Sequence, residues 1–356
     1  MVRNRSGWLV AALAIGLAGG ACKKDEAKPA DKTPAGSADK VADKAADPGM
    51  AKPVEKAAPP APGVNANAGD LALLPLDSEV VMGLNWSQLQ KSDLWTKLVA
   101  PKLMASAQPG LEKFKAACGF DPMQTITSLS AGVKGIGDTA QPTGAFVVHG
   151  LDKAKTMGCM DKAKEEAKKD GSEVTIDGDI VLVKDAKGTN VGFTFTNDST
   201  LLAVLGPAAT KEGVAEAAAG KGTLATSATF TEMYSKINTQ DSLWMLMNGN
   251  SKAFDKMPMG VKMKALFGSL NVTDGLSLDV RARLDSADKA AELANMGKMQ
   301  AQQAAKMFDK LDISNDGADV HVQVGLSQQK LQALVQQFGG MLGGAMGGGM
   351  AGGTTP

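Results

Sequence analysis

The sequence is short of the residues on which most metal sites and nucleic-acid interfaces depend. Its 356 residues include two histidines, three cysteines and one tyrosine, and aromatic residues make up only 4 % of the chain. Zinc and related metals need three or four protein ligands, and His149 and His321 are the only imidazoles available. The scarcity of aromatic rings leaves few platforms on which bases could stack. We therefore expect no metal site and no nucleic-acid partner.

Neither sign of charge is in excess. The chain has 38 Lys and Arg residues against 38 Asp and Glu residues. Removal of the first 21 residues, which contain Arg3 and Arg5, would leave 36 basic residues (38 − 2) against 38 acidic ones. A slightly acidic protein lacks the basic surface that nucleic-acid binding requires, which supports the same exclusion.

The common catalytic motifs are also missing. The sequence contains neither H-E-x-x-H nor G-x-S-x-G. Gly220–Thr223 (GKGT) is similar to part of a phosphate-binding loop, but Ala215 stands where the first Gly should be. Gly222 also displaces the metal-binding Ser or Thr. Asp177-Gly178-Asp179 lacks the further oxygen ligands of a calcium loop. We therefore expect a protein without enzymatic activity and without a cofactor.

The N-terminal residues are typical of a secretory signal. Met1–Trp8 carries two arginines and no acid, Leu9–Leu17 is apolar, and small residues precede Cys22. The apolar run is shorter than the roughly 20 residues that span a bilayer. Small residues followed by Cys resemble the lipobox of bacterial lipoproteins, although Gly19 replaces the usual Leu. We predict a signal peptide over residues 1–21 and lipidation of Cys22; the alternative is a secreted protein in which this Cys is incidental.

Two segments have the composition of disordered chain. Residues 22–69 consist mainly of Ala, Lys, Asp, Pro and Gly, and have too few large apolar residues to fold. Repeated Pro favours an extended conformation, so we predict a tether. Residues 339–356 are rich in Gly and Met and predict a flexible tail. Methionine thioethers can bind Cu(I), and whether this tail does so stays open.

Between these segments, the patterns predict an α+β fold. Asp-Gly steps flanked by alternating apolar residues predict hairpins in Val174–Val183, Leu270–Val280 and Ile313–Val324. A helical stripe over Ser286–Leu311 predicts a long amphipathic helix. Because similar strand, cap and helix patterns occur twice, we predict two tandem related modules, residues 70–222 and 223–338. Each would be a mostly antiparallel β-sheet with helices packed on one face.

The two remaining cysteines, Cys118 and Cys159, both lie in the first predicted module. In an oxidising envelope, two thiols in one compact unit are expected to form a disulfide. Two buried free thiols or a metal-binding pair are the alternatives.

The chain resembles a group of envelope lipoproteins of Gram-negative, especially myxobacterial, type. The resemblance is carried by the signal with Cys22, the Ala/Lys/Pro-rich linker, Leu71–Trp95 (LALLPLDSEVVMGLNWSQLQKSDLW) and Cys118–Leu129 (CGFDPMQTITSL). It implies a duplicated α+β domain and a location in the cell envelope. It implies no activity.

These observations favour a membrane-anchored envelope lipoprotein that acts as a non-enzymatic binding or scaffold protein for an unknown envelope protein. Acylated Cys22 would hold it to the lipid bilayer on the periplasmic side. Lys23 rather than Asp follows that Cys, which favours the outer membrane. The alternative is a periplasmic carrier of an apolar ligand such as a lipid, because Met-rich sheets could form an adaptable pocket. An enzyme that uses dispersed Asp, Glu or Lys residues is a third hypothesis.

Overall fold

The computed structural model describes residues 68–135, 142–169, 171–186, 188–249, 251 and 263–333, apart from the side chains at positions 68, 98, 102–107 and 109. The signal peptide, Cys22, nearly all of the tether and the C-terminal tail lie outside these residues and stay predictions. Within the described residues, no helix combines the length and the apolarity that crossing a membrane requires.

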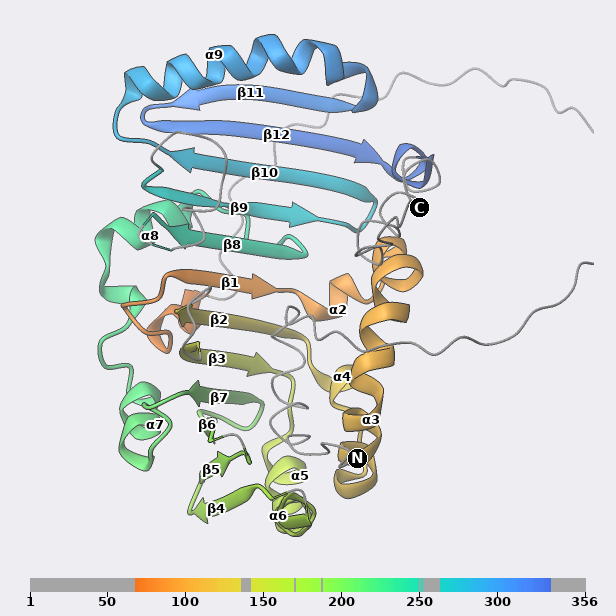
Figure 1. Ribbon diagram of the computed structural model, residues 1–356, viewed down its shortest axis with the longest axis vertical. Helices are drawn as coiled ribbons and strands as arrows, with labels where there is room; N and C mark the ends of the chain where they lie inside the picture. The colour runs from red at the N-terminus through yellow and green to blue at the C-terminus, as the bar shows by residue number, and fades with distance from the viewer. Residues whose placement is uncertain are drawn as a thin grey trace, which may run out of the picture.

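One antiparallel sheet organises the described chain (Figure 1). Its strand order is β11-β12-β10-β9-β8-β1-β2-β3-β7-β6-β5-β4. The strands are β1 (Val80–Leu84), β2 (Ser128–Lys134), β3 (Thr143–His149), β4 (Glu173–Asp177), β5 (Ile180–Lys184), β6 (Asn190–Phe195), β7 (Thr200–Leu205), β8 (Leu243–Asn248), β9 (Ala265–Asn271), β10 (Gly275–Arg283), β11 (Lys310–Asp316) and β12 (Asp319–Ser327). The helical elements are η1 (Ala68–Ala72), α2 (Trp86–Leu89), η2 (Trp95–Val99), α3 (Ala100–Cys118), α4 (Pro122–Thr125), α5 (Lys153–Gly158), α6 (Met160–Lys169), α7 (Lys211–Ala218), η3 (Leu224–Thr226), α8 (Ala228–Ser235), α9 (Ala287–Ala304) and η5 (Ala305–Met307). The predicted α+β class is confirmed.

The three predicted hairpins are also confirmed. They join β4 to β5, β9 to β10 and β11 to β12. In the two tightest, Asp177 pairs with Ile180 and Asp316 pairs with Asp319. The glycine inside each turn has a positive φ, 60° at Gly178 and 57° at Gly317. That conformation is easy for glycine and strained for most other residues, so these turns are encoded locally.

The sheet differs from the prediction of one sheet for each module. Strand β1 pairs with β2 on one side and with β8 on the other, with Met82 opposite Met245. This central pairing joins the strands of both predicted modules. Two separate sheets would each leave an open edge there, and unpaired edges invite aggregation. The common origin of the two halves stays a prediction.

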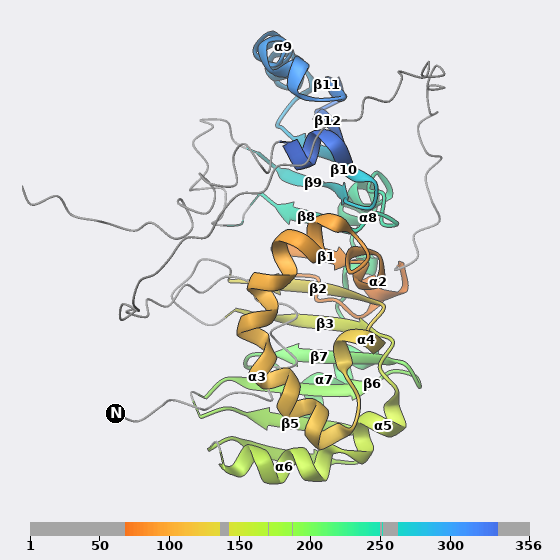
Figure 2. The same cartoon turned by 90° about the vertical axis from the view of Figure 1, so that its right-hand side faces the viewer.

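The helices pack on both faces of the sheet rather than on one. Side chains alternate along β1, so Val80 joins a buried cluster with α3 and α6, whereas Val81 joins a cluster with η1 and α8. Figure 2 shows α3 and α8 on opposite sides of the sheet. We call these sides the α3 face and the α8 face. In the first half of the sheet, formed by β1 to β7, both faces are apolar, so helices must cover both of them.

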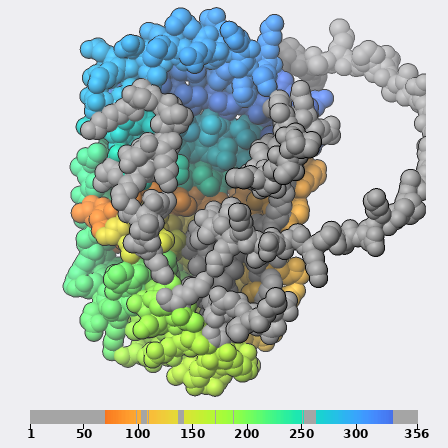
Figure 3. All heavy atoms as spheres, viewed as in Figure 1, coloured from red at the N-terminus to blue at the C-terminus, as the bar shows by residue number. Residues whose placement is uncertain are grey.

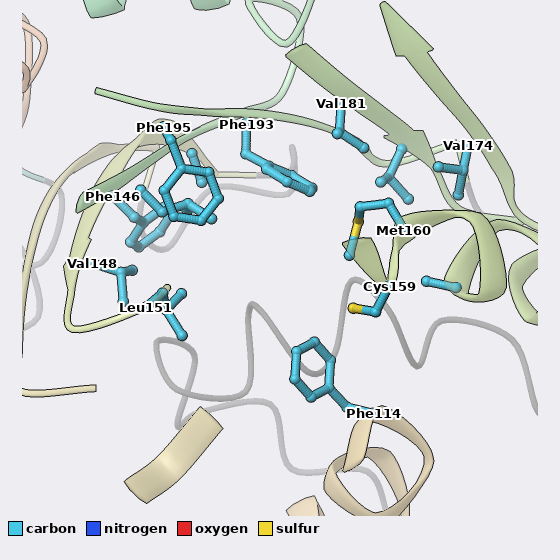
Figure 4. Packing of buried hydrophobic residues seen from close by; sticks show 14 of the residues in the cluster. Phe114, Phe146, Val148, Leu151, Cys159, Met160, Val174, Val181, Phe193 and Phe195 are labelled. Atoms are coloured by element: carbon cyan, nitrogen blue, oxygen red, sulfur yellow. The ribbon is translucent and has the colours of Figure 1, made fainter. Parts of the chain in front are cut away.

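The disulfide secures the α3 face. Phe114 of α3 and Met160 of α6 point toward Phe193 and neighbouring strand residues (Figure 4). Cys118 at the end of α3 is bonded to Cys159 between α5 and α6, with a Cα–Cα distance of 4.9 Å. The predicted disulfide is therefore confirmed over the free-thiol and metal alternatives.

The α8 face is centred on Trp244 of β8. This side chain is 1 % exposed, and Tyr234 of α8 meets it edge-on with ring centroids 5.2 Å apart. The indole lies against Gly83, the residue opposite it on β1. A Cβ atom at position 83 would lie 2.1 Å from the indole nitrogen. Gly83 therefore permits the close packing across the central pair of strands.

Candidate functional site

One polar cluster on the α8 face contains a carboxylate, an imidazole and two hydroxyls. Nε2 of His149 lies 2.9 Å from Oδ1 of Asp70, and Nδ1 lies 3.2 Å from the hydroxyl of Thr200. Ser130 donates a 2.6 Å hydrogen bond to the same carboxylate of Asp70. The order of groups is similar to the carboxylate, base and nucleophile of hydrolases.

Burial argues against nucleophilic chemistry at this cluster. Ser130 is completely buried and Thr200 is 6 % exposed, so no substrate carbonyl can approach either hydroxyl. Asp70 itself is 5 % exposed. The hydrogen bonds instead attach η1, the first described element, to β2 and β3. We conclude that Asp70 and His149 fasten the beginning of the fold to the middle of the sheet.

A second polar cluster lies on the α8 face of the second half. Asp319 of β12 is 1 % exposed and receives hydrogen bonds of 2.6 and 2.9 Å from Arg283 of β10. Lys236, just after α8, donates a third bond of 2.8 Å to Asp319. Arg283 also pairs with Glu232 of α8. This ion network links α8 to the polar side of β10 and β12, next to the apolar cluster through which α8 packs on β8 and β9.

The charges in this region shift the pKa values of two carboxyls. Burial opposes ionisation of Asp319, but the hydrogen bonds from Arg283 and Lys236 outweigh it and lower the pKa. Burial likewise opposes ionisation of Asp279, and hydrogen bonds from His321 and Gln323 lower its pKa overall. Both groups are therefore carboxylates at neutral pH, and both favour the folded state there.

We expect acid to destabilise the fold through these two carboxyls. Their pKa values are lower in the folded than in the unfolded chain, where an Asp titrates near about 3.9. Their contribution is therefore complete above about pH 5 and is lost as the pH falls through the folded-state values. Urea unfolding between pH 7 and pH 2.5 should show this decline, and Asp319→Asn should make it shallower. The exposed variant Asp77→Asn serves as a control; an equal change in that variant would contradict the assignment.

The structure places the two histidines in separate sites. His149 lies on β3 and contacts Asp70, whereas His321 lies on β12 and contacts Asp279 at 2.8 Å. Six strand steps separate β3 from β12, or about 29 Å at the usual spacing. No shared histidine site is therefore present. Across the described residues, no group of three or more His, Cys, Asp or Glu side chains is arranged to hold a metal ion.

The α3 face of the second half is almost entirely apolar. Strand register aligns residues across neighbouring strands in rows. One row is Met82, Met245, Gly268, Val280, Val322 and Ile313, and the next is Leu84, Leu243, Leu270, Leu278, Val324 and Leu311. The opposite side of these outer strands carries the charged network instead. An antiparallel sheet of this kind normally covers its apolar side.

Helix α9 covers only part of this apolar side. Its buried residues Ala290 and Ala294 pack in a cluster with Val320, Ile313 and Val322 of the outer strands. In the space-filling view, α9 runs along one end of the molecule (Figure 3). Five residues beyond it are partly exposed and join none of the described buried clusters. They are Leu266, Leu270, Leu278, Val280 and Val324. We call these five residues the apolar strip.

The sequence contained a signal for the apolar strip but not for the polar clusters. Alternation in β10 (GLSLDVRAR) and β12 (DVHVQVGLS) shows one apolar side, yet it does not say whether a helix covers that side. Asp70 and His149 are 79 residues apart, and no local pattern joins them. Of the predicted site residues, Cys118 and Cys159 come together, and Cys22 lies outside the described residues.

Comparisons with known proteins extend only to a distant likeness in fold. No family model and no curated protein matches the chain. Crystal form III of TP0453 aligns with a TM-score of 0.47 and 10 % identity, covering 75 % of this chain and 97 % of that one. Crystal form I of TP0453 aligns with a TM-score of 0.43 and 8 % identity, covering 75 % and 96 %. Likenesses this distant carry no argument about activity.

Proposed function

We propose that this protein is a membrane-anchored envelope lipoprotein that binds an amphipathic helix of an envelope partner on the apolar strip. The predicted acylation of Cys22 and the predicted tether supply the anchor and the reach. The observation that carries the proposal is the apolar strip itself. Its apolar side chains are partly exposed and adjoin one another across three strands, and contiguous apolar surface is a common feature of protein interaction sites.

The dimensions of the strip match one helix. β9, β10 and β12 are consecutive in the sheet, so two strand spacings of about 4.8 Å give a width of about 10 Å. An α-helix with its side chains has a diameter of about 10–12 Å. Helix α9 already packs on the outer strands β11 and β12 through a stripe of small and apolar residues that includes Ala290, Leu293 and Ala294. A partner helix beside α9 would continue that packing mode across β9 and β10.

Non-enzymatic binding is favoured over catalysis by the state of the polar groups. The hydroxyls next to His149 are buried, and Asp319 is saturated by Arg283 and Lys236. General acid or base catalysis needs a titrating group within reach of a substrate. The apolar strip contains no titratable side chain, and it can only bury the apolar surface of a partner.

The test replaces one residue on each side of the same strand. Leu278→Asp places a charge in the apolar strip, whereas Ser277→Asp places the same charge at an exposed position on the opposite side of β10. We expect a partner to copurify from gently solubilised membranes with the wild type and with Ser277→Asp, and to be lost with Leu278→Asp. A photocrosslinker at Leu270 should join the apolar stripe of a partner helix.

Two results would count against the proposal. One is equal recovery of the partner with Leu278→Asp and with Ser277→Asp. The other is a native mass for the extracted chain that lacks an acylated Cys22, which would remove the anchor. Circular dichroism of both variants shows whether the substituted chains are folded.

A carrier of an apolar ligand such as a lipid is the second candidate. It is favoured by Met245 and Met247, which are partly exposed beside the strip and are adaptable in shape. Native mass spectrometry separates the two functions. Extra mass of lipid size on the wild-type chain, lost in Leu278→Asp, would support the carrier.

A further inference from the structure

A cavity of about 330 Å³ lies on the α8 face of the first half, on the side of the sheet opposite to the apolar strip. Its floor is formed by Gly132, Ala145 and Val204, which are aligned across β2, β3 and β7. The loop at Pro75 and helix α7 also line it. Its volume is within the usual range of small-molecule sites.

Small residues on α7 keep this cavity open. Val214 is completely buried, and Gly213 and Ala217, four residues apart on one side of the helix, line the cavity. A Cβ atom on Gly213 would lie 2.1 Å from the carbonyl oxygen of Ala208, so glycine is needed for the close approach of that loop. Ala217 is partly buried and also packs against the buried cluster of the α8 face. Interiors are normally close-packed, and a larger apolar residue there would fill the space.

The rim of the cavity has no net preference for an ion. Lys134 pairs with Asp77, and their side chains are 46 % and 61 % exposed. The opposite charges of Lys134 and Asp77 largely cancel each other at the opening of the cavity. A charged ligand would also have to compete with one of these two side chains for the other. Thr143, also in the lining, offers a hydroxyl that can donate or accept a hydrogen bond. The remaining lining is mostly apolar and would receive a hydrocarbon.

We propose that this cavity binds an uncharged amphiphile, a molecule with one alkyl chain and a hydroxyl head group. The chain would lie over Ala145 and Val204, and the hydroxyl would lie at the rim near Thr143. An apolar cavity of 150 Å³ accepts benzene, so 330 Å³ accommodates roughly twelve carbon atoms.

A series of 1-alkanols tests the length of the site. The full chain carrying Cys22→Ser, which has no acyl group to compete, is titrated with 1-hexanol to 1-tetradecanol by displacement of N-phenyl-1-naphthylamine. Each added methylene should tighten binding about fourfold up to roughly twelve carbons, after which the affinity should level off. An affinity that keeps rising through 1-tetradecanol, or no saturable binding at all, would overturn the proposal.

Two variants and a matched control test the location. Ala217→Leu fills the cavity from α7 and should weaken binding of 1-decanol at least tenfold. Ala208 is exposed on the adjoining loop, so Ala208→Leu fills the cavity without replacing a buried residue. This variant should also weaken binding of 1-decanol. Ala215→Leu adds the same volume at an exposed position of α7 outside the lining and should leave the affinity unchanged. Wild-type affinity in both filling variants would place the binding elsewhere.

The chemical class is tested with charged analogues of equal length. Decanoate and decyltrimethylammonium should both bind at least tenfold more weakly than 1-decanol. Equal or tighter binding of either ion would overturn the assignment of an uncharged ligand. Because the cavity and the apolar strip lie on opposite sides of the sheet, Leu278→Asp should leave alkanol binding intact. Loss of the partner helix and loss of alkanol binding are therefore separate results.

Discussion

Replacement of Arg283 by methionine is expected to lower the free energy of unfolding by about 3 kcal/mol. The substitution removes two hydrogen bonds from Asp319, a carboxylate that is 1 % exposed. Lys236 would remain as its one strong cationic partner, and a buried charge that has lost half of its compensation is costly. Urea unfolding followed by circular dichroism at pH 7 measures the change.

An exposed ion pair provides the control for this prediction. Lys97 and Asp93 are paired on a helix surface, with side chains 62 % and 43 % exposed. Lys97→Met should change the free energy of unfolding by less than about 0.5 kcal/mol. The double variant Arg283→Met with Asp319→Asn should recover part of the loss, because the buried charge is then absent. A loss below about 1 kcal/mol in Arg283→Met alone would show that water compensates Asp319.

Removal of the disulfide is expected to have the second large effect. The bond closes a separation of 41 residues, and the chain-entropy model gives about 4 kcal/mol for a loop of this length. The double variant Cys118→Ala with Cys159→Ala should therefore unfold at a much lower urea concentration. The wild type in reducing buffer should match that variant. If reduction left the wild type unchanged while the double variant was destabilised, the loss would come from packing around Cys159 and not from the bond.

Local signals explain why part of the fold was predictable. An Asp-Gly turn between alternating apolar residues specifies a hairpin without reference to the rest of the chain, and Gly178 and Gly317 have the positive φ that such turns need. The disulfide was predictable for a different reason. Two cysteines in one folded unit and an expected oxidising compartment were sufficient to favour a bond between Cys118 and Cys159.

Long-range pairing explains what the sequence did not show. The pattern over Ser286–Leu311 fits one helix, but α9 ends at Ala304 and β11 begins at Lys310. Leu311, which fits the helical stripe, lies on β11 opposite Val324 of β12. Tertiary pairing has overridden a local helical pattern there. The single sheet depends in the same way on the packing of Trp244 against Gly83, two residues from different predicted modules.

The polar clusters and the cavity were the least predictable part, because their residues meet only in the folded chain. Lys236, Arg283 and Asp319 come from a loop and two separate strands, and each looks like an ordinary surface charge in the sequence. The cavity depends on small residues from three strands and a helix, and small residues give no periodic signal. Sequence patterns can show that a strand has an apolar side, but they cannot show which part of that side is covered by a helix.

The attachment of η1 has a mechanical consequence. Asp70 ties the first described element to His149 and Ser130, on strands near the middle of the sheet rather than at an edge. A pull on the predicted tether would therefore load the centre of the molecule first. Strand β1 follows directly and is hydrogen-bonded along both sides, to β2 and β8. A force applied through such a tether would have to shear two ladders at once instead of unzipping a single edge strand.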